Sequence, residues 1–104
     1  MALTKLSPKD PSESVVVTFD FSNLLDQVGG EILTTAIWTV SVISGIDASP
    51  QNLLSGTYTL KNYMSMSLIK GGISGVNYMI QATATTSYGQ VLLLSSSMLI
   101  QVQS

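Results

Sequence analysis

The sequence contains no cysteine, no histidine and no arginine. Without cysteine there is no disulfide framework and no thiolate metal site. Without histidine the commonest general base and metal ligand is missing, and a Ser-His-Asp apparatus cannot form. Without arginine the chain lacks the bidentate contacts that recognise guanine and phosphate. These absences argue against a nucleic-acid partner and against the commonest hydrolytic and zinc sites.

Charge is also scarce. Charged residues make up 10% of the 104 residues, against about 25% in an average soluble domain, whereas hydrophobic residues make up 45%. The net charge at pH 7 is −2, and the segment from Gly71 to Ser104 holds no charged side chain. The surface of this segment must therefore consist of neutral polar residues. We expect part of that surface to be covered by another chain or segment.

Long hydrophobic runs are absent as well. No apolar stretch reaches the roughly 18 residues of a membrane-spanning helix, and residues 1–13 lack the apolar centre of a signal peptide. The expectation is a soluble protein made in the cytoplasm, with no membrane partner.

What is present is an alternation of apolar and polar residues with a period of two, which predicts β-strands with one buried face. We expect the following residues on the buried faces of successive strands: Val15, Val17, Phe19 and Phe21; Ile32, Ala36, Trp38, Val40 and Val42; Met64, Met66 and Leu68; Val76, Tyr78, Ile80, Ala82 and Ala84; Met98, Ile100 and Val102. A shorter strand is expected at Thr57–Leu60.

Segments rich in Gly, Ser, Asp, Asn and Pro separate these strands, with one short helical turn expected at Gln51–Leu54. The last strand, from Gln90 towards Gln103, is expected to be kinked or bulged at Ser95–Ser97. Six or seven strands without a convincing helix predict an all-β, antiparallel β-sandwich. We assign residues 1–12 to an N-terminal arm or linker and residues 13–104 to this single domain.

Two aromatic residues point to an immunoglobulin-like or fibronectin-like sandwich. In such folds a tryptophan of the third strand packs in the core, and a tyrosine stands near the start of the sixth. Trp38 and Tyr78 occupy these places, and Val17 and Ile80 fill the position of the usual disulfide. The predicted structural core contains these residues: Val17, Phe19, Trp38, Val40, Tyr78 and Ile80.

Candidates for enzyme chemistry are few. The carboxylates lie in turns, in the N-terminal segment or on the outward side of a strand, so we give little weight to a glycosidase pair. The "GGISG" segment leads into a strand rather than a helix, which indicates a hairpin turn and not a phosphate-binding loop. The "DASPQN" segment offers too few oxygen ligands for calcium. We therefore predict no catalytic residue, no metal site and no cofactor.

The segment "QVLLLSSSMLIQV" is apolar on both sides of the predicted strand, and a strand of this kind needs cover on both faces. The cover is either a segment of the same chain or another protein, and the sequence leaves both explanations open. The candidate interface residues are Leu3, Leu6, Leu92, Leu94 and Leu99.

An ordered series of short motifs runs along the chain: "KDPSESVVVTFDFSNLL", "GGEILTTAIWTVSV", "KGGISGVNYMIQATATTSYGQ" and a closing "LIQV". This series resembles a family of small phage proteins, the fiber-tail adaptors. The resemblance extends from about Lys9 to the end of the chain. This sequence departs from the family pattern after "TSYG", where apolar residues 91–94 replace charged ones.

The resemblance implies a non-enzymatic virion protein, made in the host cytoplasm, that repeats in a ring at the tail or neck and helps to attach fibres. Its partners would then be other virion proteins and further copies of itself. Two other functions remain open: a capsid decoration protein, and a carbohydrate-binding module using Tyr58, Tyr63 or Tyr88 for stacking.

Overall fold

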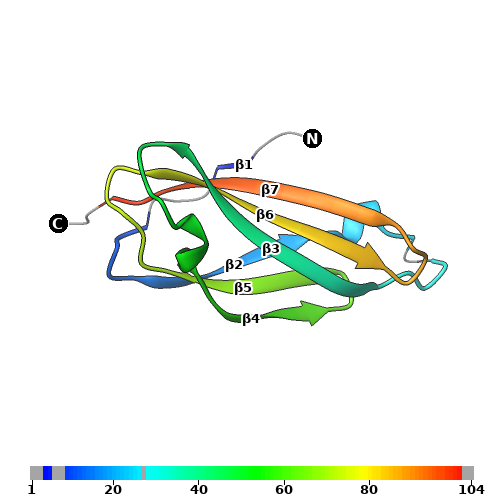
Figure 1. Ribbon diagram of the computed structural model, residues 1–104. Coiled ribbons are helices and arrows are strands. Elements are labelled where there is room, and N and C mark those ends of the chain that lie inside the picture. Colours follow the sequence, from blue (N-terminus) through cyan, green and yellow to red (C-terminus); the bar gives the residue numbers. More distant parts are fainter. Residues whose placement is uncertain (1–3, 6–8, 27, 102–104) are drawn as a thin grey trace.

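The computed structural model describes residues 4–5, 9–26 and 28–101. Two β-sheets face each other along an elongated molecule (Figure 1). The strands in chain order are β1 (Thr4–Lys5), β2 (Ser14–Asp20), β3 (Leu33–Ser44), β4 (Leu54–Lys61), β5 (Met64–Lys70), β6 (Asn77–Thr86) and β7 (Val91–Leu99). Single 3-10 turns, η1 (Ser22–Leu24) and η2 (Pro50–Leu53), lie in two connections, and η2 confirms the short helical turn expected near Gln51.

Six of these strands form two antiparallel three-stranded layers, which confirms the all-β, antiparallel prediction. One layer has the order β7-β6-β3 and is extended at β7 by the two-residue strand β1, which runs parallel to it. We call it the long sheet. The other has the order β2-β5-β4, and we call it the short sheet.

The core lies between the two sheets, and Trp38 of β3 makes contacts across it. The ring of Trp38 packs against Phe19 of β2 with centroids 5.0 Å apart, and its Nε1–H donates a hydrogen bond of 2.8 Å to the hydroxyl of Ser65 on β5. One side chain of the long sheet thus contacts two strands of the short sheet, β2 and β5. All six residues assigned to the core from the sequence are buried: Val17, Phe19, Trp38, Val40, Tyr78 and Ile80.

The start of β3 differs from the expected alternation. Ile32 was expected inside, but it is exposed and Leu33 is buried in its place. The pairing of β3 with β6 shifts register between Leu33 and Thr35. Such an irregularity inserts a residue into one strand and so changes which residues face the core.

The prediction for β5 had the wrong phase. Ser65, Ser67 and Ile69 face the core, and Met64 and Met66 face outward. Leu68 is outward too. The alternation of methionine with serine did not show which residues face the core. The hydroxyl of the buried Ser65 accepts a hydrogen bond from the Trp38 indole, and a hydrogen-bonded hydroxyl can be buried without the usual desolvation penalty.

The kink expected at Ser95–Ser97 is not present. The pairing of β7 with β6 continues without a shift from Val91 to Leu99. Ser96 and Ser97 are both buried, and they are the residues that pair with β1. The run of small residues therefore marks the place where another strand approaches closely.

The N-terminal segment is attached to the sandwich at Lys9 as well. The Lys9 N–H donates to Leu99 at 2.9 Å and its carbonyl accepts from Gln101 at 2.8 Å. The Lys9 ammonium is buried and donates to the carbonyls of Asp10 and Gly71. Burial lowers the pKa of this lysine, and the nearby carboxylates of Glu13 and Asp10 partly oppose that effect.

Candidate functional site

On β3, β6 and β7, the outer face of the long sheet carries no charged residue over four consecutive rows, and the fourth row meets Lys5 of β1 at the far side of β7. Each row takes one outward residue from β3, one from β6 and one from β7. We call this surface the neutral face, and its rows are Thr35, Thr85 and Val91; Ile37, Thr83 and Leu93; Thr39, Gln81 and Ser95; Ser41, Met79 and Ser97.

Apolar side chains stand near both edges of the neutral face. Ile37 on β3 is 66% exposed, and on β7 Val91 is 66% and Leu93 42% exposed. Between them lie threonine hydroxyls. In the next row, Gln81 receives a hydrogen bond from Thr39 at 3.5 Å and donates one to Ser95 at 3.2 Å. The face therefore offers apolar groups and neutral hydrogen-bonding groups, which suits a protein partner better than a charged ligand.

The interface residues chosen from the sequence take different positions. Leu92 and Leu94 are two residues apart, so both point to the same side of β7, and they pack partly against the core. Leu99 is half-buried near the end of the strand. Leu3 and Leu6 lie outside the described residues. The strand is apolar on both sides, as the sequence indicated, but the residues exposed on its outer side are Val91 and Leu93. The candidate interface residues chosen from the sequence did not include these two.

The outer face of the short sheet is different. An apolar depression of about 410 Å³ is lined there by Val16, Thr59, Met66 and Leu68, with Ser67 at its border. Charged residues stand around it: Asp20 and Lys61 lie on either side of Met64 in one row, and Lys70 ends β5. We call this surface the charged face.

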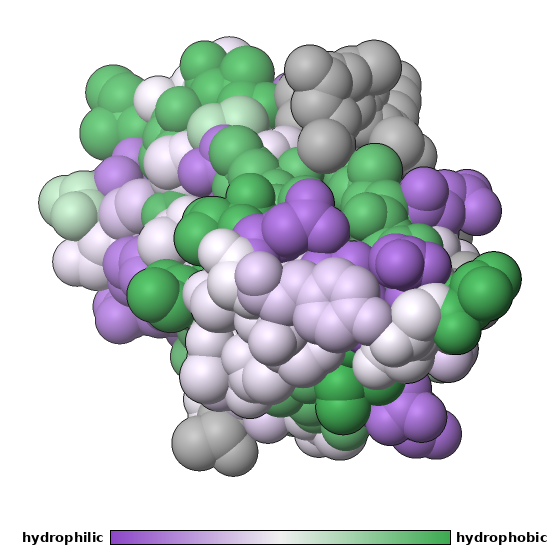
Figure 2. Space-filling model, turned by 90° about the vertical axis from the view of Figure 1, so that its right-hand side faces the viewer, coloured by the Kyte–Doolittle hydropathy of each residue, from purple (hydrophilic) through white to green (hydrophobic). Residues whose placement is uncertain are grey.

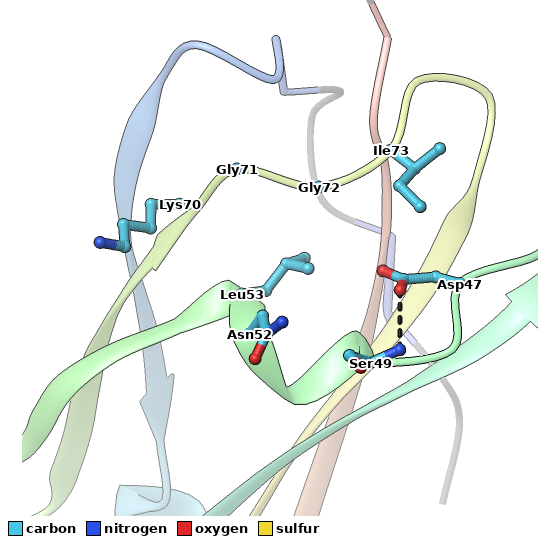
Figure 3. A pocket seen from close by; sticks show the side chains of 8 residues that line it. All are labelled: Asp47, Ser49, Asn52, Leu53, Lys70, Gly71, Gly72 and Ile73. Carbon is cyan, nitrogen blue, oxygen red and sulfur yellow. Dashed lines mark hydrogen bonds between the residues drawn. The ribbon is translucent and has the colours of Figure 1, made fainter.

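One end of the sandwich holds a pocket between the β3–β4 and β5–β6 connections (Figure 3). Asp47 lies at its wall and accepts hydrogen bonds from the Ser49 N–H at 2.9 Å and from the Tyr78 hydroxyl at 2.7 Å. Lys70 lies on the rim with its ammonium pointing away from Asp47 (Figure 3). Because its carboxylate is already bonded, Asp47 holds the loop in place, as expected for an Asp in a turn.

Tyr78 ties this end together. Its hydroxyl donates to Asp47 and accepts from the Ile73 N–H at 3.0 Å, so it links β6 to both connections. The hydrogen bond from Tyr78 holds the pKa of Asp47 below its ordinary value, with the Ser49 N–H acting in the same direction. Burial raises the pKa of Tyr78, and the bond to Asp47 adds to this. Neither group is poised to exchange a proton near neutral pH.

The opposite end of the molecule is shown in Figure 2, where hydrophobic groups alternate with polar ones. Glu31 is fully buried there. Its carboxylate accepts bonds from the Thr86 hydroxyl, the Asp26 N–H and the Gln90 amide. The bond from Thr86 is the main reason that the pKa of Glu31 lies below its ordinary value. Glu31 therefore fastens the β2–β3 connection to the β6–β7 turn.

The three tyrosines considered for sugar stacking lie on different elements. Tyr58 is on β4, Tyr63 is in the β4–β5 turn and Tyr88 is in the β6–β7 turn. The Tyr88 hydroxyl donates to the carbonyl of Gly29 and so has a structural contact. Among the residues that the structure describes, no group of three or more Asp or Glu side chains could hold a metal ion. Within the same residues, no helix has the length and apolar character needed to cross a membrane.

Comparison with protein families matches residues 9–99 to the family described as podophage GP4 fiber-tail adaptor protein gp77. The chain belongs to this family. The match begins at Lys9, the residue that fastens the N-terminal segment to β7, and ends with β7 itself. No curated protein matches the sequence. The family is one of structural adaptors between fibre and tail, so the chain is a non-enzymatic phage tail protein.

Proposed function

We propose that this protein is a virion subunit that repeats in a ring at the tail or neck and joins tail and fibre proteins through the neutral face. The family supports the adaptor role. The observation that carries the surface assignment is the absence of charge over the four rows of the neutral face, together with the exposure of Ile37, Val91 and Leu93.

Physical chemistry favours burial of such a face. Covering one exposed aliphatic side chain stabilises a complex by up to about 1.5–3 kcal/mol, and a ring repeats that contact at every subunit. The hydroxyls of Thr83 and Thr85 can exchange water for a partner's backbone groups, whereas a buried charge would need a paired partner. A neutral surface is therefore inexpensive to cover.

Mass spectrometry of purified particles with quantified copy number, followed by a particle map, tests the role. Several copies at the tail or neck are expected. A subunit found on the capsid shell would instead identify a decoration protein, and one missing from the particle would overturn the proposal.

The neutral face is tested by placing a charge at its centre. Thr83→Lys is expected to weaken incorporation into particles at least tenfold, because the ammonium would be buried without a counter-ion. Thr18→Lys, on the charged face, is the matched control and is expected to be incorporated normally. Equal incorporation of both variants would exclude the neutral face as the contact surface.

We also infer that the sandwich is immunoglobulin-like in topology. The order β1-β7-β6-β3 opposite β2-β5-β4 is compatible with that arrangement. Support comes from the core position of Trp38 on β3 and from Tyr78, whose hydroxyl bonds the backbone five residues upstream at Ile73. An experimental structure with a different strand order would remove this assignment.

A further inference from the structure

The edges of the two sheets differ in how they are protected. Native proteins usually guard an edge strand with charges, proline or irregular pairing. In the short sheet β2 carries Asp20, β4 carries Lys61, and the pairing of β4 is irregular between Ser55 and Thr59. In the long sheet β3 and β7 contain neither a charged residue nor a proline. These two strands of the long sheet thus lack the charges and prolines that commonly protect an edge, and the pairing of β3 is irregular only near its two ends.

Among the residues that the structure describes, the β3 edge is capped at two places, and no strand pairs with it between them. The Leu33 N–H donates to the carbonyl of Asn62 at 2.9 Å. Further along, the Val40 N–H donates to the side-chain oxygen of Gln51, which takes the place of a neighbouring strand's carbonyl. Because backbone groups alternate in direction along a strand, those of Ala36 and Trp38 point to the same open side as Val40.

The β7 edge is also occupied over one half. Its outer side pairs with β1 at Ser96 and Ser97, and with Lys9 beyond. Lys9 is bonded to Leu99 and Gln101, so the odd-numbered residues direct their backbone groups outward. Val91 and Leu93 therefore point their backbone groups to the side of β7 that faces away from β6.

The two open stretches lie at the same level of the sheet. Ala36 shares a row with Leu92, and Trp38 shares a row with Leu94. In Figure 1, β1 and η2 lie towards the left, and the open halves of β7 and β3 extend to the right. Since β3 and β7 are both antiparallel to β6, they run in the same direction.

We propose that neighbouring subunits join by parallel pairing of the β3 edge of one copy with the β7 edge of the next, an inference that rests on the ring function proposed above. In this pairing Ala36 lies opposite Leu92, and Ile37 lies opposite Leu93. A parallel ladder requires one residue of each opposed pair to direct its backbone groups at the other. Ala36 does so and Leu92 does not, and their side chains face the same side, so phase and face both agree. Lys9 already bonds to β7 in this manner.

A second copy fits this edge better than an unrelated strand because of what lies beside β3. A groove of about 320 Å³ runs there and is lined by Ala36, Trp38, Leu54 and Tyr58, among others. The incoming β7 would turn Leu92 and Leu94 towards it. Both leucines are half-buried at their own edge, so the contact would cover their exposed parts. On the outer surface Leu93 would meet Ile37 of the neighbour. A head-to-tail contact of two different edges forms rings when its rotation closes.

The absence of native cysteine makes disulfide crosslinking a clean test. Directly opposed residues on paired strands have Cα atoms within the range that a disulfide can span. Particles carrying the double variant Ile37→Cys with Leu93→Cys are expected to give a ladder of crosslinked multimers after mild oxidation. Each single variant is expected to stay uncrosslinked, because a head-to-tail contact never brings two copies of one edge together. The pair Thr18→Cys with Leu93→Cys is the matched control.

A charge at the β3 edge gives an independent test. Ile37→Lys is expected to fold as the parent does and to lower particle incorporation at least tenfold. Val16→Lys changes an equally exposed β-branched residue at an edge of the short sheet, since the two side chains are 66% and 64% exposed. It is expected to assemble normally.

These outcomes separate the two proposals. Two results would overturn the edge pairing and leave the ring function intact. One is multiple copies at the tail with no more crosslinked multimers than the control pair Thr18→Cys with Leu93→Cys gives. The other is assembly that is lost with Val16→Lys and retained with Ile37→Lys. A crosslinked dimer of either single-cysteine variant would indicate a two-fold contact and would overturn it too. Absence of the protein from the particle would remove the ring function itself.

Discussion

The outer faces of the two sheets each expose an aliphatic side chain on an edge strand and yet differ as surfaces. Ile37 of the long sheet and Val16 of the short sheet are exposed almost equally. Asp20, Lys61 and Lys70 lie on the same face as Val16, whereas the rows around Ile37 contain no charge. Exposed apolar area alone therefore does not distinguish an interface from a solvated surface. The charges beside it do, since they make close approach of another chain costly.

The largest expected effect comes from cutting the contact between the sheets at Trp38. Trp38→Ala removes the packing on Phe19 and the bond to Ser65, and it is expected to reduce the free energy of unfolding by about 3–5 kcal/mol. Urea denaturation measures this. Trp38→Phe retains most of the ring but leaves the Ser65 hydroxyl without its donor, so about 1–3 kcal/mol is expected. Equal losses for both variants would contradict the importance of the ring.

A smaller effect is expected at Tyr78, which fastens both connections at one end. Tyr78→Phe removes the hydroxyl that bonds Asp47 and the Ile73 N–H. Because both partners lose a bond, a loss of about 1–3 kcal/mol is expected in urea denaturation. Tyr63→Phe, in a turn at the other end, is the control and is expected to change stability by less than about 0.5 kcal/mol. A loss at Tyr63 as large as at Tyr78 would contradict this role.

Acid is expected to loosen the molecule at both ends. Hydrogen bonds hold the pKa values of Glu31 and Asp47 below their ordinary values. A carboxyl group of this kind stabilises the fold above its ordinary pKa, and the contribution is lost as the pH falls through the lowered pKa. The melting temperature is therefore expected to stay level from about pH 7 to about pH 5 and to fall below about pH 4.

Glu31→Gln checks the assignment of this acid effect, because the amide does not titrate. The variant is expected to melt lower than the parent at neutral pH and to lose less on acidification. An unchanged acid profile would mean that other carboxylates dominate.

The smallest expected effect concerns the phase of β5. Met66 points outward on the charged face, and Met66→Thr is expected to change stability by less than about 1 kcal/mol. Ile69→Ala, on the buried side of the same strand, is expected to cost about 2–5 kcal/mol. A reversed order would show that the methionine side of β5 is the buried one.

Much of this fold could be predicted because strand alternation is a local property. In β6, Tyr78, Ile80, Ala82 and Ala84 alternate with polar residues and are all buried. The prediction was wrong in β5 because Ser65 is buried with a hydrogen bond from Trp38, a residue on another strand, and Met66 therefore faces outward. It was also wrong at Ile32, because a shift in pairing depends on β6, which lies far away in the sequence.

The candidate surface was only partly predictable for a similar reason. The sequence indicated that residues 91–94 are apolar on both sides of a strand, and this led to Leu92 and Leu94. Which pair faces outward depends on the register with β6, and the register places Val91 and Leu93 on the neutral face. Ile37 joins them through two strand pairings that no short stretch of sequence encodes.

By itself the sequence determined the lack of thiol and imidazole chemistry and the scarcity of charge, because these follow from composition. It also determined the all-β class, because a period of two is a local property of each strand. Only the tertiary structure decided that the missing charges gather into the four rows of the neutral face and that the open parts of β3 and β7 lie at the same level. Both properties arise from hydrogen-bonded pairing between segments distant in the chain, and that pairing is fixed when the two sheets close over their core.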